Sequence, residues 1–250
     1  MWPKPCDVTV REVRPNWRMA KRPMSGEELR SFQVSPDRGS VSSVLLRPPG
    51  SRALLVLGHG AGTNARHPFM ETLAQALADA GVATFRFNYP YSESGRGGMD
   101  GERVRLATVQ LAVATARESA PDLPTFAGGH SMSGRMATLA VSKGMIDRLS
   151  GIVAYAFPLH RPGRPDTARA EHLAEVEVPT LFLSGDRDRM ARMDLFGEVV
   201  DELSANAGLH VLEAADHSFK VLKRSGRTIE DVVDEAAYVT SEWMAEQIKG

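Results

Sequence analysis

Three residues of the types that work together in nucleophilic catalysis follow three predicted strands. Ser131 stands in GGHSMSGR, Asp188 in GDRDRM and His217 in ADHSFK. A serine hydroxyl needs a base to take its proton, and the base needs a carboxylate that holds its tautomer. The pattern therefore predicts Ser131 as a nucleophile, His217 as its base and Asp188 as the acid that orients the imidazole.

The residues around Ser131 predict a sharp turn from a strand into a helix. The usual pattern of such a turn is G-x-S-x-G, because both flanking positions approach neighbouring backbone and must be small. Gly129 fits the pattern, whereas Ser133 departs from it but is still small. Ser133 itself is the poorer candidate, because Arg135 would stand two residues after it. Since many serines at such places only cap a helix, the prediction rests on the three residues together.

Two aspartates compete for the role of the acid. Asp186 and Asp188 lie in the same predicted loop, and the pattern G-x-x-D counted from Gly185 favours Asp188. Asp186 would then fix the loop. The three residues follow one another in the order serine, aspartate, histidine. The separation between Asp188 and His217 leaves room for one helix and one strand.

Acyl transfer also needs fixed N–H donors for the charge that develops on the carbonyl oxygen. The residue after the nucleophile, Met132, is one expected donor. The loop LGHGAGTN supplies the other, with Ala61 preferred and Gly62 as the alternative. The glycines of this loop lack the spacing of G-x-G-x-x-G and of the P-loop, so we expect no nucleotide cofactor.

Strand-like and helix-like segments alternate along most of the chain. They predict an α/β fold with a doubly wound, mostly parallel sheet, helices on both faces and no large cap domain. Functional groups of such sheets gather at the carboxyl ends of the strands. Strands are expected at 29–34 and 41–46, which start the sheet in antiparallel fashion, and at 53–59, 82–88, 125–129, 151–157, 179–185 and 210–214. Helices are expected at 68–80, 101–118, from 131 onward, and at 167–174, 191–205 and 229–248.

The N-terminal segment has a different composition. Residues 1–24 hold six Lys or Arg against two acidic residues, with four prolines that oppose a helix. We therefore predict a basic extension over 1–28 and a single α/β domain over 29–250. A loose extension is the preferred interpretation, and a basic targeting or binding arm is the alternative.

The composition of the 250 residues excludes several classes of partner. A net charge of −1 gives no general reason to bind nucleic acid, and no apolar run is long enough to span a membrane. The single cysteine cannot form an internal disulfide or a cysteine-based zinc site, and the histidines lack ligand spacing, so we expect no metal. A cytoplasmic location is expected. Oligomeric state leaves no signal in the sequence.

Several segments together resemble the α/β-hydrolase superfamily and, within it, the dienelactone-hydrolase-like group. A narrower subgroup, with bacterial hydrolases and a subunit of an animal chromatin-modifying complex, is similar in HGAG, HPFM, FNYPY, GHSMSGR, AFPLHRPGRP and DHSFK. Dienelactone hydrolase has cysteine where this chain has Ser131, so its lactone substrate is not carried over. The resemblance implies a hydrolase of a small-molecule ester or acyl substrate.

Two functions follow from these observations. The first is a serine hydrolase of esterase or thioesterase type that works through an acyl-enzyme. The alternative is a non-catalytic scaffold or protein-interaction subunit that keeps the fold. Without a cap, we expect an open cleft lined by residues after the strands, namely Tyr89, Tyr91, Met132, Phe157, His160 and Phe219.

Overall fold

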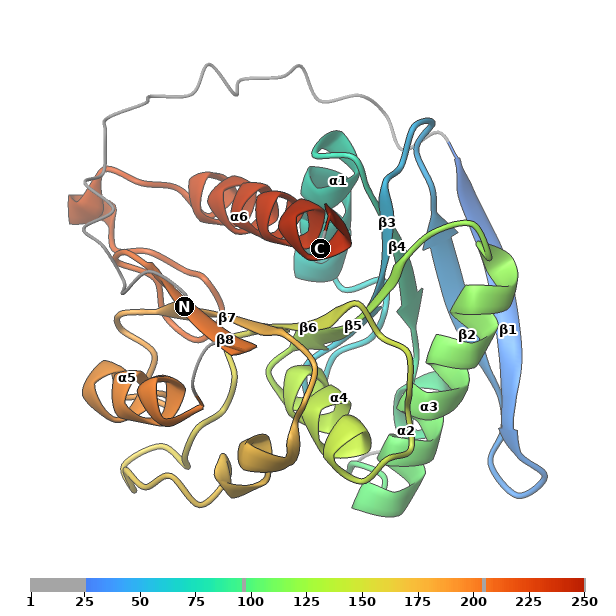
Figure 1. Ribbon diagram of the computed structural model, residues 1–250, viewed down its shortest axis with the longest axis horizontal. Coiled ribbons are helices and arrows are strands. Elements are labelled where there is room, and N and C mark those ends of the chain that lie inside the picture. The colour runs from blue at the N-terminus through green and yellow to red at the C-terminus, as the bar shows by residue number, and fades with distance from the viewer. Residues whose placement is uncertain (1–25, 96–97, 204–205, 250) are drawn as a thin grey trace.

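The computed structural model describes residues 26–95, 98–203 and 206–249, and an eight-stranded sheet forms its centre (Figure 1). The strand order is β1-β2-β4-β3-β5-β6-β7-β8. Strand β2 pairs antiparallel with β1 and β4, and the remaining neighbours are parallel. This confirms the predicted fold class. The strands are β1 (Glu27–Ser35), β2 (Gly39–Leu46), β3 (Ala53–Gly58), β4 (Val82–Phe87), β5 (Thr125–His130), β6 (Gly151–Tyr155), β7 (Thr180–Gly185) and β8 (Ala207–Leu212).

Helices cover both faces of this sheet (Figure 1). Helices α1 (Pro68–Asp79) and α6 (Ile229–Lys249) pack together on one face. Helices α3 (Glu102–Ser119), α4 (Met132–Ser142) and α5 (Met193–Glu202) cover the other. Shorter turns of helix are α2 (Pro90–Glu93), η1 (Glu171–Glu175) and η3 (Lys223–Ser225).

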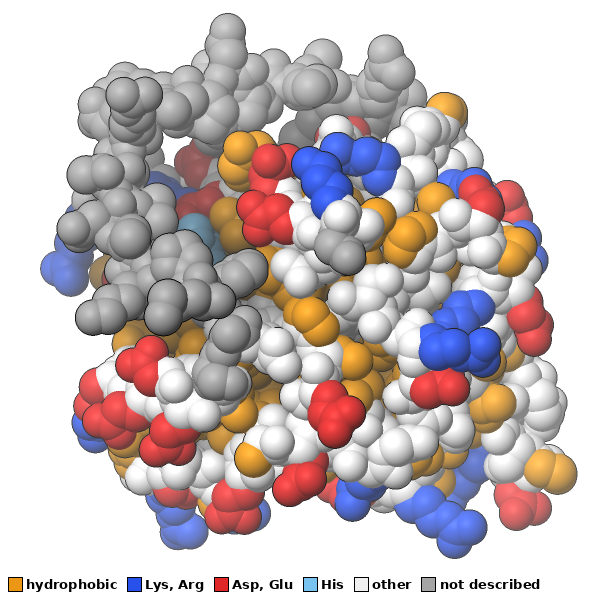
Figure 2. All heavy atoms as spheres, viewed as in Figure 1, with side chains coloured by type: hydrophobic (Ala, Val, Ile, Leu, Met, Phe, Trp, Pro, Cys, Tyr) orange, Lys and Arg blue, Asp and Glu red, His pale blue; other side chains and the backbone are white. Residues whose placement is uncertain are grey.

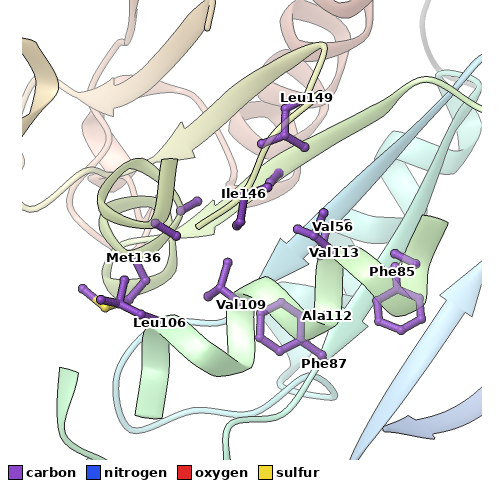
Figure 3. Close-up of a cluster of buried hydrophobic side chains, with 14 of the residues drawn as sticks. Val56, Phe85, Phe87, Leu106, Val109, Ala112, Val113, Met136, Ile146 and Leu149 are labelled. Atoms are coloured by element: carbon purple, nitrogen blue, oxygen red, sulfur yellow. The ribbon is translucent and has the colours of Figure 1, made fainter. Parts of the chain in front are cut away.

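The central strands are buried on both faces, as parallel strands between two helical layers must be. In β3, Leu54 and Val56 belong to the apolar cluster under α3 and α4, whereas Leu55 and Leu57 belong to the cluster under α1 and α6. Figure 3 shows part of the first cluster, with Val56 among side chains from α3 and α4. Close packing on both sides fixes the strand ends that carry the loops of interest.

The structure departs from the predicted elements at short or weakly patterned segments. Strand β8 begins at Ala207, before the predicted start at 210. The prediction missed its first residues because Ala207 and Gly208 lack the β-branched or aromatic character of a typical strand. The predicted helix over 167–174 is a 3₁₀ turn at Glu171–Glu175. Four-residue α2 is too short to show a helical period and was not predicted.

The expected extension falls mostly outside the described residues, which start at residue 26. Strand β1 begins at Glu27, so residues 27 and 28 belong to the sheet. Between β6 and β7 the chain forms loop and η1 alone, with no inserted domain. None of the described helices combines the length and apolar character needed to cross a membrane. Acidic and basic side chains are interspersed over the face shown in Figure 2.

Candidate active site

Ser131, His217 and Asp188 form a chain of hydrogen bonds at the carboxyl edge of the sheet. Ser131 Oγ lies 2.8 Å from His217 Nε2, and His217 Nδ1 lies 2.7 Å from Asp188 Oδ2. The Asp188 side chain is completely buried, whereas the His217 side chain is 23% exposed. Because His217 donates its Nδ1–H to the carboxylate, the Nε2 lone pair faces the serine hydroxyl. The arrangement can take a proton from Ser131.

The turn that presents Ser131 is strained. Its φ of 51° and ψ of −109° lie outside the favoured regions for a residue with a side chain. The Ser131 N–H donates to Tyr155 O at 2.7 Å, which ties the turn to β6. A Cβ on Gly129 would lie 2.2 Å from Gly58 O, so this position accepts only glycine. Such strain, held in place by the surrounding strands, is typical of functional turns.

Ser133 fits beside the turn because Gly58 leaves space for it. A Cβ on Gly58 would lie 2.4 Å from Ser133 Oγ. The fully buried Ser133 hydroxyl donates to His59 O at 2.6 Å and accepts from the Tyr89 hydroxyl at 2.8 Å. Its proton is therefore already committed to a carbonyl, which gives Ser133 a positioning role and leaves Ser131 as the serine that meets the imidazole.

The acid loop after β7 brings Asp188 to the imidazole and leaves Asp186 exposed. Asp188 Oδ1 accepts from the Met190 N–H at 2.7 Å, so both carboxylate oxygens have partners. The buried His160 holds this loop from the next strand end: its backbone N–H donates to Met190 O at 2.9 Å, and its Nε2 accepts from the Arg192 N–H at 3.0 Å.

His160 also uses its other ring nitrogen, because Nδ1 donates to Arg161 O at 2.9 Å. With both ring nitrogens bonded, it has no donor or acceptor left for a substrate. The expectation that His160 lines a pocket is therefore wrong, since its ring is buried and connects two loops by hydrogen bonds.

The loop after β8 holds His217 by its backbone. Asp216 Oδ1 accepts from the N–H groups of Ser218 at 2.8 Å and Lys220 at 3.0 Å. The His130 Nε2–H donates to His217 O at 2.9 Å. Burial, and then the nearby His217, lower the pKa of His130 to about 4, so His130 stays neutral at pH 7. From the sequence, His130 is expected only to shape the glycine turn beside it, and Asp216 was given no role, although an aspartate that starts a tight loop is a common signal.

The loop after β3 has a fixed backbone next to the serine turn. Gly60 O accepts from His59 Nδ1 at 2.8 Å and from Thr63 Oγ1 at 2.9 Å. A trans peptide points its N–H away from its C=O, so the Ala61 N–H faces away from these donors. A Cβ on Gly60 would lie 2.6 Å from His130 Nδ1, which shows how closely the loop approaches the residue before Ser131.

The His59 ring stabilises this loop as a neutral group. Burial lowers the pKa of His59 to about 4. Because Nδ1 carries the proton donated to Gly60 O, the other nitrogen accepts from the Ser92 hydroxyl at 3.2 Å. Met132, the second expected N–H donor, is the first residue of α4, and the N–H groups of a first helical turn have no partner within the helix.

The aromatic residues predicted to line an open cleft are core residues instead. Tyr89, Phe157 and Phe219 have no exposed surface, so the prediction is wrong for these three. Phe157, for example, packs against Phe182 with ring centroids 5.4 Å apart. Tyr91 is 7% exposed and lies under the loop after β3, with its ring centroid 6.1 Å from that of His59. Phe219 likewise packs against Phe69 of α1, with ring centroids 5.5 Å apart.

A cavity of about 500 Å³ lies elsewhere, between η1 and α5. Its lining includes Leu173, Glu177 and Leu203 but none of the three hydrogen-bonded residues described above. Among the described residues, no three His, Cys, Asp or Glu side chains are grouped so that they could hold a metal ion.

Comparison with known proteins agrees with the fold described above. Residues 51–245 match the family model described as "Alpha/beta hydrolase domain". A serine hydrolase homologue from Coxiella burnetii has a TM-score of 0.67 and 19% identity, covering 88% of this chain and 99% of that one. Dienelactone hydrolase from Anabaena variabilis has a TM-score of 0.66 and 18% identity, covering 89% and 99%.

A Mycobacterium tuberculosis protein named as a phosphoribosyl transferase is 29% identical over 206 residues, which are 80% of this chain and 44% of that protein. The chain thus spans less than half the length of the curated relatives that it matches. The match to the family model covers most of the chain, and the solved structures share its fold over nearly their whole length. The chain therefore belongs to the α/β-hydrolase family.

Proposed function

We propose that this protein is a serine hydrolase that cleaves ester or thioester bonds through an acyl-enzyme. The observation that carries the proposal is the continuous contact from Ser131 Oγ through His217 to the buried Asp188. The strained serine turn supports it, because a serine that only caps a helix needs no such backbone. The hydrolase family of the chain is consistent with it.

In the first step, Ser131 Oγ attacks the acyl carbon while its proton passes to His217 Nε2. Asp188 stabilises the imidazolium that forms and keeps the ring oriented. The tetrahedral intermediate collapses when His217 gives the proton to the leaving alcohol or thiol, which leaves an ester bond between the acyl group and Ser131. Water then attacks this ester with the same base, releasing the acid and restoring the serine.

The backbone N–H groups of Met132 and Ala61 are proposed to stabilise the oxyanion, with Gly62 as the alternative to Ala61. The first lies at the N-terminus of α4, where the helix dipole also favours negative charge. The second belongs to a loop whose carbonyl is held by His59 and Thr63. Donors fixed before the reaction need no reorganisation in the transition state.

Hydrolysis of matched esters and thioesters of graded acyl length tests this proposal. We expect turnover that is lost in Ser131→Ala, and the profile of acyl lengths identifies the preferred acyl group. If the purified protein hydrolyses none of these substrates, the non-catalytic scaffold becomes the better interpretation. The phosphoribosyl transfer named for the mycobacterial relative is not proposed, since more than half of that protein lies outside the match.

A further inference from the structure

Three arginines converge at the edge of the sheet where Ser131 lies. Arg105 and Arg135 stand in the first turns of α3 and α4, and Arg169 lies in the segment that follows β6. Both helices begin at the carboxyl edge, because α3 leads back to the start of β5 and α4 leaves the end of β5. Long helical side chains point back toward the helix N-terminus, so both guanidinium groups are directed toward this edge.

The positive charge of this cluster is only partly balanced. Arg135 Nη1 lies 3.7 Å from Glu102 Oε2, and Arg169 Nη1 donates to His160 O at 3.3 Å. The pKa of Arg135 is lowered mainly by burial, with Glu102 acting against the shift and the positive charges of Arg169 and Arg105 adding to it. Among the described residues, the one salt bridge of this cluster joins Arg135 to Glu102.

Two of these guanidinium groups also hold unused donors away from water. The Nε atoms of Arg105 and Arg135 are buried, and within the described residues neither has a hydrogen-bond partner. The Arg135 side chain keeps 24% of its surface exposed, so its outer guanidinium nitrogens, rather than the enclosed Nε, can donate to a ligand.

The cluster lies close to the proposed nucleophile. The Arg135 N–H donates to Ser131 O at 3.3 Å, which places Arg135 one helical turn from the nucleophile. Arg105 lies near enough to the phenols of Tyr89 and Tyr91 to oppose the rise that burial causes in the pKa of each. Tyr89 in turn bonds to Ser133, beside the serine turn.

We propose that Arg105, Arg135 and Arg169 form an anion subsite beside Ser131, and that the substrate carries a carboxylate or phosphate group at some distance from the bond that is cleaved. This inference rests on the proposed function and adds a substrate class to it. Guanidinium groups suit planar carboxylates and phosphates because they offer several donors in a fixed geometry. An uncharged acyl chain would offer no acceptor to these guanidinium groups.

The test compares esters that differ only in terminal charge. The 4-nitrophenyl monoester of adipic acid and 4-nitrophenyl hexanoate share a six-carbon acyl chain, and the former ends in a carboxylate. We expect kcat/KM for the charged ester to exceed that for the neutral one by about tenfold or more, since hydrogen bonds to charged groups contribute on this scale. The preference should fall as ionic strength rises. A 4-nitrophenyl ester that ends in a phosphonate distinguishes phosphate from carboxylate as the preferred group.

Arg105→Gln should lower the ratio of the two kcat/KM values by about tenfold or more, by the same reasoning. Arg103→Gln is the matched control, because Arg103 lies in the same turn of α3 but is exposed, and it should leave the ratio unchanged. Equal rates for the two esters in the wild type, or an unchanged ratio in Arg105→Gln, would overturn the subsite.

A binding measurement separates the subsite from the proposed function. Adipate and inorganic phosphate are titrated into Ser131→Ala and into the double variant that also carries Arg105→Gln. We expect at least one anion to bind the single variant and to bind about tenfold more weakly to the double variant. If no ester is hydrolysed but this difference is seen, the proposed function fails and the anion site stands. If esters are hydrolysed but neither anion binds and no charge preference is seen, the subsite alone fails.

Discussion

Replacing Ser133 by alanine tests how the structure holds the loop after β3. The Ser133 hydroxyl connects the Tyr89 hydroxyl to His59 O, with distances of 2.8 Å and 2.6 Å. Ser133→Ala leaves both buried partners unpaired, and each unpaired group costs about 1–3 kcal/mol. The free energy of unfolding should therefore fall by roughly 2–6 kcal/mol, which lowers Tm by roughly 5–20 °C for a domain of this size.

The smaller change Tyr89→Phe should have a smaller effect. Ser133 then loses a donor but still gives its own proton to His59 O, so no buried N–H or O–H is left unpaired. We expect a loss of about 1 kcal/mol. The larger loss of stability in Ser133→Ala than in Tyr89→Phe follows from the direction of the two hydrogen bonds.

Catalysis should also respond to Ser133→Ala. A loosened His59 carbonyl lets the Gly60–Ala61 peptide shift, so kcat should fall about tenfold, less than the roughly 10²–10³ that follows complete loss of an oxyanion donor. KM should change less than twofold, because ground-state binding does not use the oxyanion donors. Kinetics on one activated ester, together with thermal unfolding, measures both effects.

Ser43→Ala is the matched control. The Ser43 hydroxyl is buried, but within the described residues it has no hydrogen-bond partner, so its removal should change stability by less than about 1 kcal/mol. If Ser133→Ala behaves like Ser43→Ala in both Tm and kcat, the connection through Ser133 does not position the loop and the reasoning is refuted.

Two further predictions concern the acid and the buried histidines. Asp188→Asn should lower kcat by about 10²–10⁴, because the amide favours the wrong imidazole tautomer, whereas Asp186→Asn should lower kcat less than about tenfold. Steady-state kinetics of both variants measures the two losses. A larger loss in Asp186→Asn than in Asp188→Asn would exchange the two roles. His59 and His130 have pKa values lowered to about 4, so below about pH 6.5 the unfolded chain binds protons that the folded chain does not. Stability should then fall by about 1 kcal/mol per pH unit for each histidine between pH 6.5 and 5. A flat profile in urea unfolding over that range would contradict the burial of the two rings.

Much of the fold could be predicted because the parallel strands are short apolar runs between helices with a clear period. The three residues that meet at the sheet edge could be predicted for a related reason, since the carboxyl ends of parallel strands lie together and Ser131, Asp188 and His217 each follow one. The edge strand β8 was harder to place, because Ala207 and Gly208 carry little strand signal.

The surroundings of the site could not be predicted in the same way. Phe157 and Phe219 stand after strand ends as pocket residues would. A one-dimensional pattern does not show that helices α5 and α1 pack rings against them. The Ser133 side chain fits beside the turn only because Gly58, which lies far away in the sequence, has no side chain. The hydrogen bond from the Arg192 N–H to His160 likewise connects two loops that only the folded chain brings together.

The central claim is that Ser131 is an activated nucleophile, and covalent labelling tests it most directly. A fluorophosphonate probe reacts with a serine whose hydroxyl is activated by a neighbouring base, and mass spectrometry of the digested protein locates the adduct. We expect the adduct on Ser131 in the wild type, none in Ser131→Ala, and slower labelling at Ser131 in Ser133→Ala. Absence of an adduct under conditions that label a control esterase, or an adduct on another residue, would contradict the account.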